Sequence, residues 1–291
     1  MAEIVCLGEL LIDFCAMVRD TPVGEAPGFT KAPGGAPANV AVAAVRLGRP
    51  AGFIGAVGAD PFGEFLRGVL QAEGVATAGL RRRDDVKTPL AFVAVHSDGT
   101  GDFFFYHDAG LAPLREADVV TDSIASARAF HFGSISRIEP EARGATDAAR
   151  RVAAEAGALI SYDPNYRPRL WDGQAEARRR LREGFEGTTV AKVSDEEWGF
   201  ILGTDDFAEG AAALFDVGVR LVIRSEGAGG ASFATAHASG HADAFDVDPI
   251  EFTGAGDAFT AGLLTGLLDL QDQGATCEDL DEAVLRKVVR R

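Results

Sequence analysis

Short apolar segments alternate with helical stretches along most of this chain, and the alternation restricts the possible folds more than any single motif. Strand–helix–strand repeats are typical of a mostly parallel sheet with helices on both faces. With 291 residues and 47% hydrophobic content, the chain can bury a large core. We therefore predict an α/β fold. The expected strands are residues 4–13, 53–58, 129–133, 158–163, 190–193 and 220–224, and the expected helices include 62–73 and 142–156.

The segment 88–106 departs from this alternation. Leu90-Ala-Phe-Val-Ala-Val95 and Asp102-Phe-Phe-Phe-Tyr106 flank a turn-rich connection at 97–101. Two apolar runs joined in this way predict an antiparallel hairpin. We expect the hairpin to be an insertion into the α/β unit.

Acidic residues outnumber basic residues by 44 to 28, which gives a formal charge of −16. This charge repels phosphate backbones and anionic lipids, so neither nucleic acid nor membrane is an expected partner. No apolar run reaches the roughly 20 residues of a membrane span, and the N-terminus lacks the pattern of a secretory signal. We expect a cytoplasmic protein. The three cysteines and the scattered histidines show no metal-ligand spacing, so reduced thiols and no structural zinc are expected.

The segment Glu251-Phe-Thr-Gly-Ala-Gly-Asp-Ala-Phe259 has the pattern of an anion-binding turn. Its two glycines leave successive backbone N–H groups uncovered, and a following helix adds the positive end of its dipole. Asp257, next to such a turn, could take a proton from a hydroxyl group that attacks a phosphoryl group. The alternative is that Asp257 is an ordinary helix N-cap.

Other polar residues also follow predicted strands. In open α/β sheets, ligands bind at the carboxyl ends of strands, and Asp13, Asp163-Pro-Asn165 and the turn before Asp257 fall at or just after such ends. The chain has no Walker-type loop and no Gly-x-Gly-x-x-Gly after its first strand, so phosphate binding is left to residues 254–257. Asp13, Asn39, Asn165 and Asp257 offer groups that bind hydroxyls. This combination suggests phosphoryl transfer to a polyol.

Several motifs, in this order, resemble the ribokinase-like (PfkB) carbohydrate kinases. They are Gly34-Gly-Ala-Pro-Ala-Asn-Val40, Gly55-Ala-Val-Gly-Ala-Asp-Pro-Phe-Gly63, Tyr162-Asp-Pro-Asn165 and Thr253-Gly-Ala-Gly-Asp-Ala-Phe259. The resemblance runs from Ile4 to the last residue and implies a Rossmann-like core with a small β lid. The expected core is 1–13, 34–87 and 109–291, and the expected lid is 14–33 and 88–108.

Within that family, four segments look most similar to fructokinases. These are Glu9-Leu-Leu-Ile-Asp-Phe14, residues 31–39, His131-Phe-Gly-Ser-Ile-Ser136 and Lys192-Val-Ser-Asp-Glu-Glu197. The implied reaction is ATP-dependent conversion of D-fructose to fructose 6-phosphate. A 2-keto-3-deoxygluconate kinase, or a non-catalytic fructokinase-like binding protein, is the alternative.

The resemblance also implies roles for individual residues. Asp257 would be the general base, and the N–H groups of Gly254, Ala255 and Gly256 would form the anion hole. The sugar would be bound by Asp13, Gly34, Gly35, Asn39, Phe105, Asn165 and Arg167. From residue chemistry alone, Gly34 and Gly35 could be an ordinary turn, Phe105 lid core, and Arg167 a surface cation.

On the nucleotide side, the implied residues are Lys192, Ser225, Gly227 and Gly230 together with Gly254. The segment 225–230 could equally be a plain turn between strands. Magnesium is expected to accompany ATP, with Glu197 acting on it indirectly. Glu251 stands where relatives commonly have an aspartate linked to a monovalent-cation site, so a potassium site there is an open possibility.

Two further expectations concern assembly and length. Phe92, Phe103 and Phe105 would give the lid hairpin one apolar surface, through which a homodimer could form. Relatives continue beyond the position of Arg291 into a helix that lines the adenine pocket. Either the sequence is truncated there or the adenine site is incomplete.

Overall fold

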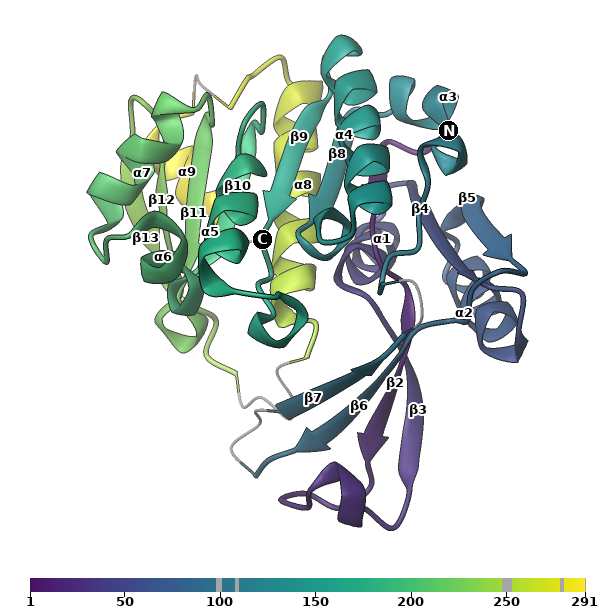
Figure 1. Ribbon diagram of the computed structural model, residues 1–291. Coiled ribbons are helices and arrows are strands. Elements are labelled where there is room, and N and C mark those ends of the chain that lie inside the picture. The colour runs from purple at the N-terminus through teal and green to yellow at the C-terminus, as the bar shows by residue number, and fades with distance from the viewer. Residues whose placement is uncertain (98–100, 108–109, 248–252, 278–279, 291) are drawn as a thin grey trace.

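The structure is a computed structural model, and it describes residues 1–291 except 98–100, 108–109, 248–252, 278–279 and 291. Within the described residues the strands form two sheets, one of nine strands and one of four. Figure 1 shows helices on both faces of the larger sheet, and the smaller sheet projecting from one end of it. The predicted α/β fold with a small β lid is confirmed.

The larger sheet is parallel except at one edge, where β12 and β13 run antiparallel. In spatial order its strands are β13 (Ser239–Ala242), β12 (Ala231–Ala234), β11 (Leu221–Ser225), β10 (Val190–Ser194), β9 (Leu159–Asp163), β8 (Ala129–Gly133), β1 (Ile4–Leu7), β4 (Ala51–Gly58) and β5 (Ala76–Arg83). Because neighbouring parallel strands end at the same edge, the last residues of β8, β9, β10 and β11 lie close together.

Successive residues of each strand face opposite helix layers. Ile4 and Cys6 of β1 belong to one core cluster, and Val5 and Leu7 belong to the other. The first cluster is covered by α1 (Ala36–Arg46), α2 (Pro61–Ala72), α8 (Ala255–Asp272) and α9 (Glu282–Val289). The second is covered by α3 (Thr121–Ala125), α4 (Pro140–Glu155), α5 (Gln174–Glu183), α6 (Asp195–Leu202) and α7 (Phe207–Asp216).

Five short 3-10 turns complete the described secondary structure. They are η1 (Val23–Glu25), η2 (Glu116–Asp118), η3 (Ile135–Arg137), η4 (Pro168–Leu170) and η5 (Gly227–Gly229). Among the described helices, none combines the length and the apolar character that crossing a bilayer requires.

The smaller sheet has the strand order β3-β2-β6-β7. Its strands are β3 (Phe29–Gly34), β2 (Leu11–Ala16), β6 (Leu90–Val95) and β7 (Gly101–Tyr106). The strands β6 and β7 pair antiparallel, as the hairpin prediction required. An ammonium–aromatic contact helps to attach this sheet to the core, since Lys31 Nζ lies 3.6 Å from the centre of the Phe65 ring.

The prediction of one strand over residues 4–13 is wrong. The chain leaves the larger sheet after Leu7 and enters the smaller sheet at Leu11. Both strands are largely buried, and Glu9 and Leu10 between them are buried too, so the apolar run continues across the change of sheet. Asp13 therefore lies inside a strand of the smaller sheet and does not end a strand of the core.

The expectation of a single apolar lid surface is also corrected. Phe103 pairs opposite Val93, and Phe92 pairs opposite Phe104, so Phe92 and Phe103 lie on different faces of the sheet. Phe103 and Phe105 stack on each other, with their ring centres 6.0 Å apart, and face the core. Phe92 lies on the other face and packs against Phe14.

Candidate active site

A cavity of about 490 Å³ lies between the smaller sheet and the carboxyl edge of the larger sheet. It brings together most of the predicted sugar-binding and catalytic residues. Of these, Asp13, Gly35, Asn39, Phe105, Asn165, Arg167, Gly254, Gly256 and Asp257 line it, and so does Lys192, which was predicted on the nucleotide side. Its lining also includes Glu9, Phe103, Ile135, Asp163 and Glu196. The volume lies within the range of small-molecule sites.

The glycine turn before α8 opens the helix toward this cavity. Gly254 is the N-cap residue, with φ of 81°, and no atom of the described residues lies within 4 Å of the position that a Cβ would occupy. No side chain of the described residues caps the helix. The turn therefore presents backbone N–H groups and a positive helix end to the cavity, an arrangement that binds anions.

Asp257 lies in the first turn of α8, so the hypothesis that it is the N-cap is wrong. Its Oδ2 accepts a hydrogen bond of 2.8 Å from Asn39 Nδ2, donated by α1. Burial raises the pKa of Asp257 to about 6, helped by the nearby Asp163, while Asn39, Lys192 and Arg167 act in the opposite direction. A carboxylate with a pKa close to neutral is suited to general base catalysis.

A buried ion pair lies beneath the glycine turn. Lys192 Nζ donates to Asp163 Oδ2 at 3.0 Å, and both side chains are 8% exposed. A Cβ at Gly256 would lie only 3.2 Å from Lys192 Nζ, so the ammonium group lies directly under the turn. Burial lowers the pKa of Lys192, but Asp163 and Glu197 raise it above its ordinary value. Lys192 therefore remains a cation and adds to the positive field of the helix end.

A second glycine turn, at Gly34 and Gly35, begins α1. A Cβ at Gly34 would lie 2.2 Å from Asp13 Oδ2, and a Cβ at Gly35 would lie 2.3 Å from the carbonyl oxygen of Glu9. Gly35 also has a φ of 114°, which strongly favours glycine. The absence of a side chain at Gly34 and Gly35 thus lets this turn pack directly against Asp13 and the backbone of Glu9, beside the cavity.

Glu9 was not among the predicted site residues. It is 3% exposed, lines the cavity, and accepts a hydrogen bond from the Ala36 N–H through Oε1 at 2.9 Å. Its Oε2 is buried without a hydrogen-bond partner among the described residues. Burial raises the pKa of Glu9 to about 7. The sequence signal was a glutamate inside an otherwise apolar run, since a carboxylate in such a place needs a specific reason.

The remaining sugar-side residues come from both sheets. Asn165 has a φ of 44°, and its N–H donates to Asp163 Oδ1 at 3.2 Å, which holds the chain after β9 in a tight turn. The guanidinium carbon of Arg167 lies 5.9 Å from the centre of the Phe103 ring, so Arg167 reaches from the core to the lid. Gly34 does not line the cavity, although it adjoins Asp13.

The predicted nucleotide-side segment 225–230 is a tight turn between β11 and β12. Gly227 and Gly230 have φ values of 55° and 99°, and the Glu226 N–H donates to the Gly230 carbonyl. Ser225 is paired in register with Ser194, at the same sheet edge as the cavity. Neither Ser225 nor these glycines line the cavity.

Glu197 does not line the cavity either. It is 8% exposed and accepts hydrogen bonds from the N–H groups of Tyr166 and Ser194, so it connects α6 to the chain next to Arg167. Burial raises its pKa, and Asp163 adds to that effect. Within the described residues no cluster of His, Cys, Asp and Glu side chains could hold a metal ion by itself. Glu251 lies outside the described residues.

Comparison with known proteins gives matches over almost the whole chain. The family model described as pfkB family carbohydrate kinase matches residues 1–286. A relative from Arabidopsis thaliana, described as probable fructokinase-4, is 43% identical over 99% of this chain and 87% of its own length. Among solved structures, fructokinase with bound ATP from Xylella fastidiosa has a TM-score of 0.85 at 33% identity, covering 100% of this chain and 89% of that one.

A second similar solved structure contains bound ligands. It is a double mutant of fructokinase from Vibrio cholerae O395, described as a fructose, ADP and potassium ion bound form. Its TM-score is 0.85 at 32% identity, and the match covers 99% of this chain and 89% of that one.

Proposed function

The chain belongs to the pfkB family of carbohydrate kinases, and on that basis we propose that it transfers the γ-phosphoryl group of ATP to the primary hydroxyl of D-fructose. The product would be fructose 6-phosphate. The observation that carries this proposal is the pairing of Asp257 with the uncapped first turn of α8 inside one cavity. A base for the hydroxyl proton and a binding site for the transferred anion are thus adjacent.

In the proposed reaction, Asp257 takes the proton of the sugar hydroxyl while the hydroxyl oxygen forms a bond to the γ-phosphorus. The bond between that phosphorus and the bridging oxygen breaks, and ADP leaves with the electron pair. The hydrogen bond from Asn39 fixes one carboxylate oxygen of Asp257. The helix N-terminus and Lys192 stabilise charge on the phosphoryl oxygens. The proton on Asp257 is later released to solvent.

On the sugar side, we assign hydroxyl binding to Asp13, Asn39, Asn165 and the turn at Gly34 and Gly35. Phe103 and Phe105 cover the sugar from the lid, and Arg167 lies beside them. With the lid over the sugar, water would be kept from the γ-phosphoryl group.

On the nucleotide side, we assign phosphate and ribose contacts to Ser225, Gly227 and Gly230. Support comes from their place at the sheet edge where β10 and β11 end. Magnesium would neutralise the triphosphate and would be held mostly by phosphate oxygens and water. Acidic side chains such as Glu197 would influence the ion without binding it directly. A monovalent-cation site near Glu251 is a further part of the proposal.

A coupled assay of ADP release with fructose, ATP and magnesium tests the activity. Fructose-dependent ADP release is expected, and its absence from a well-folded chain would exclude the proposed reaction. A panel of fructose, 2-keto-3-deoxygluconate and ribose ranks the substrates, because an arginine after Asp-Pro-Asn also suits an acidic sugar. Replacing potassium with a large organic cation in the same assay tests the monovalent-cation site.

We also propose that two copies pair through the outer face of the lid. Phe104 and Tyr106 on this face are 46% and 62% exposed, and they lie on the face opposite to the cavity-lining Phe103 and Phe105. An exposed aromatic face on a small sheet favours pairing with a second copy. Sedimentation at micromolar concentration is expected to show a dimer, and Tyr106→Ser is expected to weaken it.

A further inference from the structure

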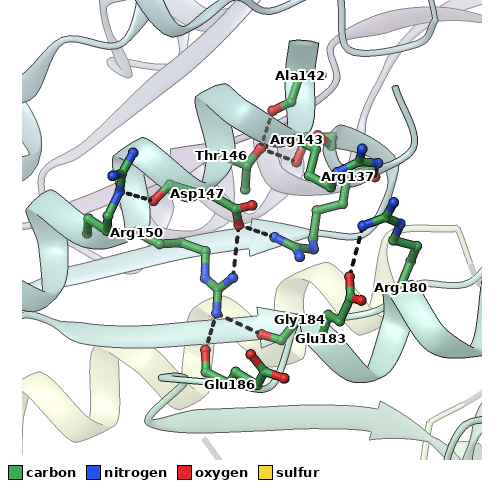
Figure 2. Close-up of polar contacts among 12 residues, drawn as sticks. Arg137, Ala142, Arg143, Thr146, Asp147, Arg150, Arg180, Glu183, Gly184 and Glu186 are labelled. Atoms are coloured by element: carbon green, nitrogen blue, oxygen red, sulfur yellow. Dashed lines mark hydrogen bonds and ion pairs between the residues drawn. The ribbon is translucent and has the colours of Figure 1, made fainter. Parts of the chain in front are cut away.

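A second cavity, of about 400 Å³, is lined by α4, α5, the chain after α5 and η3. It shares no lining residue with the candidate active site. Its charged lining residues are Arg137, Arg150, Arg151, Asp147, Glu183 and Glu186. Figure 2 shows the polar contacts of this region.

Two arginines, Arg137 which is buried and Arg150 whose side chain is 13% exposed, share one carboxylate oxygen there. Arg137 is 3% exposed, and its Nη1 donates to Asp147 Oδ1 at 2.5 Å. Arg150 Nη1 donates to the same oxygen at 3.1 Å, and Figure 2 shows both guanidinium groups pointing at Asp147. Asp147 itself is 43% exposed. The Nε atoms of both arginines are buried without a hydrogen-bond partner among the described residues. One carboxylate oxygen thus faces two guanidinium groups, of which one is buried and the other largely so.

Among the described residues, the other two carboxylates of the cavity form no ion pair with Arg137 or Arg150. Glu183 is already engaged by Arg179 and Arg180. Glu186 is exposed, and its backbone carbonyl accepts a hydrogen bond from Arg150. Arg151 is exposed and donates through Nε to the backbone carbonyl of Asp147 at 3.4 Å.

The titration of the arginines also indicates a local excess of positive charge. Burial lowers the pKa of Arg150, and Arg137 lowers it further. Burial likewise lowers the pKa of Arg143, with Arg180 and Arg137 adding to the effect. This excess stands out in a chain whose formal charge is −16.

We propose that this cavity is a second anion site that binds a small phosphate-bearing molecule. Guanidinium groups match phosphate oxygens in geometry as well as charge, and buried pairs of this kind are among the strong hydrogen bonds. The cavity volume suits a ligand the size of a sugar phosphate. An anion here would supply the charge that Asp147 alone does not.

Two chain segments connect this cavity with the candidate active site. In η3, Ile135 lines the first cavity and Arg137 lines the second. In β9, Asp163 lines the first cavity, and Ile160, three residues earlier on the same strand, lines the second. An anion held by Arg137 fixes η3, so we infer that its binding changes the KM for the sugar. This coupling rests on the proposed kinase activity, whereas the binding itself does not.

Binding is tested by calorimetric titration of the full chain with inorganic phosphate in sulfate-free buffer. Arg151→Gln removes an exposed cation at the rim and is expected to weaken binding about fivefold. Asp147→Asn removes the competing carboxylate and is expected to strengthen binding about threefold or more. Arg82→Gln is the charge-matched control. Arg82 lies on β5, pairs with Glu64 of α2 and has a side chain that is 40% exposed. The control variant is expected to leave this phosphate binding unchanged.

Opposite responses of the first two variants cannot arise from phosphate bound at the glycine turn of α8. If both variants titrate like the wild-type chain, or if no phosphate binds, the second site does not exist. The test does not use Arg137→Gln, because loss of the buried Arg137 side chain could impair folding. A sugar KM that stays constant while phosphate saturates the site would overturn the coupling and leave the binding result intact.

Discussion

The two glycine turns that begin α1 and α8 look alike in sequence but differ in what occupies the helix end. At α1, the Cβ position of Gly35 is blocked by the backbone of Glu9, and the Glu9 carboxylate accepts a hydrogen bond from the first N–H of the helix. At α8, no described residue lies within 4 Å of the Cβ position of Gly254, and no described side chain caps the helix. The first turn is filled by the protein itself, whereas the second leaves room for an external anion.

The strongest test of this contrast is Asp257→Asn. The variant removes the proposed base next to the open turn, so turnover should fall by about 10²–10⁴-fold while fructose binding is largely retained. ADP release measures the first effect and calorimetry the second. Asp281→Asn, at the N-cap of α9, is the matched control and should keep full activity, because asparagine also caps helices. A nearly normal rate in Asp257→Asn would rule out Asp257 as the base.

Alanine at the two glycines should separate the filled turn from the open one. Gly35→Ala combines an unfavourable positive φ with a clash against the backbone of Glu9, and we expect a loss of about 3 kcal/mol in the free energy of unfolding. Gly254→Ala meets no atom of the part of the chain that the structure describes and should lose only about 1 kcal/mol. Urea denaturation measures both losses.

Gly68→Ala is the control for these substitutions. Gly68 lies inside α2 with open space around it, so alanine there should be neutral or slightly stabilising. Equal losses at positions 35 and 254 would contradict the distinction between the turns.

Glu9→Gln tests the carboxylate that caps the filled turn. The folded chain holds a proton on Glu9 up to pH about 7, above the ordinary range of a glutamate, so Glu9 contributes stability at low pH that is lost as the pH rises through 7. The wild-type chain should therefore lose about 3 kcal/mol relative to Glu9→Gln between pH 4 and pH 8. The difference between the two pH profiles isolates Glu9 from other groups. Parallel profiles would show that Glu9 does not titrate in this range.

The smallest effect concerns the pH dependence of catalysis at the open turn. Because burial raises the pKa of Asp257 to about 6, protonation of the base should lower kcat/KM about tenfold at pH 5 relative to its value above pH 7. The fraction of folded protein is measured separately at each pH, so that unfolding is distinguished from protonation of Asp257. A profile that stays flat down to pH 5 would contradict the perturbed carboxylate.

The sequence predicted the elements that depend on local pattern. The strand at 129–133, the strand predicted at 220–224 and found one residue later, the helix around 142–156 and the hairpin of β6 and β7 follow from short-range periodicity and turn residues. The failed predictions involve pairing between distant segments. The run 4–13 crosses from one sheet to the other without a break in its apolar character, and Phe92 lies on the other face of the lid from Phe103 because strand register sets the faces.

By itself, the sequence determined the alternation of strands and helices along most of the chain, the two glycine turns and the presence of Asp257 next to one of them. Only the tertiary structure decided which polar groups meet. The hydrogen bond between Asn39 and Asp257 joins residues 218 positions apart, and Lys192 of β10 lies next to Gly256 of α8. Periodicity is a property of neighbouring residues, whereas such contacts depend on how strands are ordered and aligned across the sheet. For that reason the open helix end, its buried cation and the Glu9 cap were visible only in the folded chain.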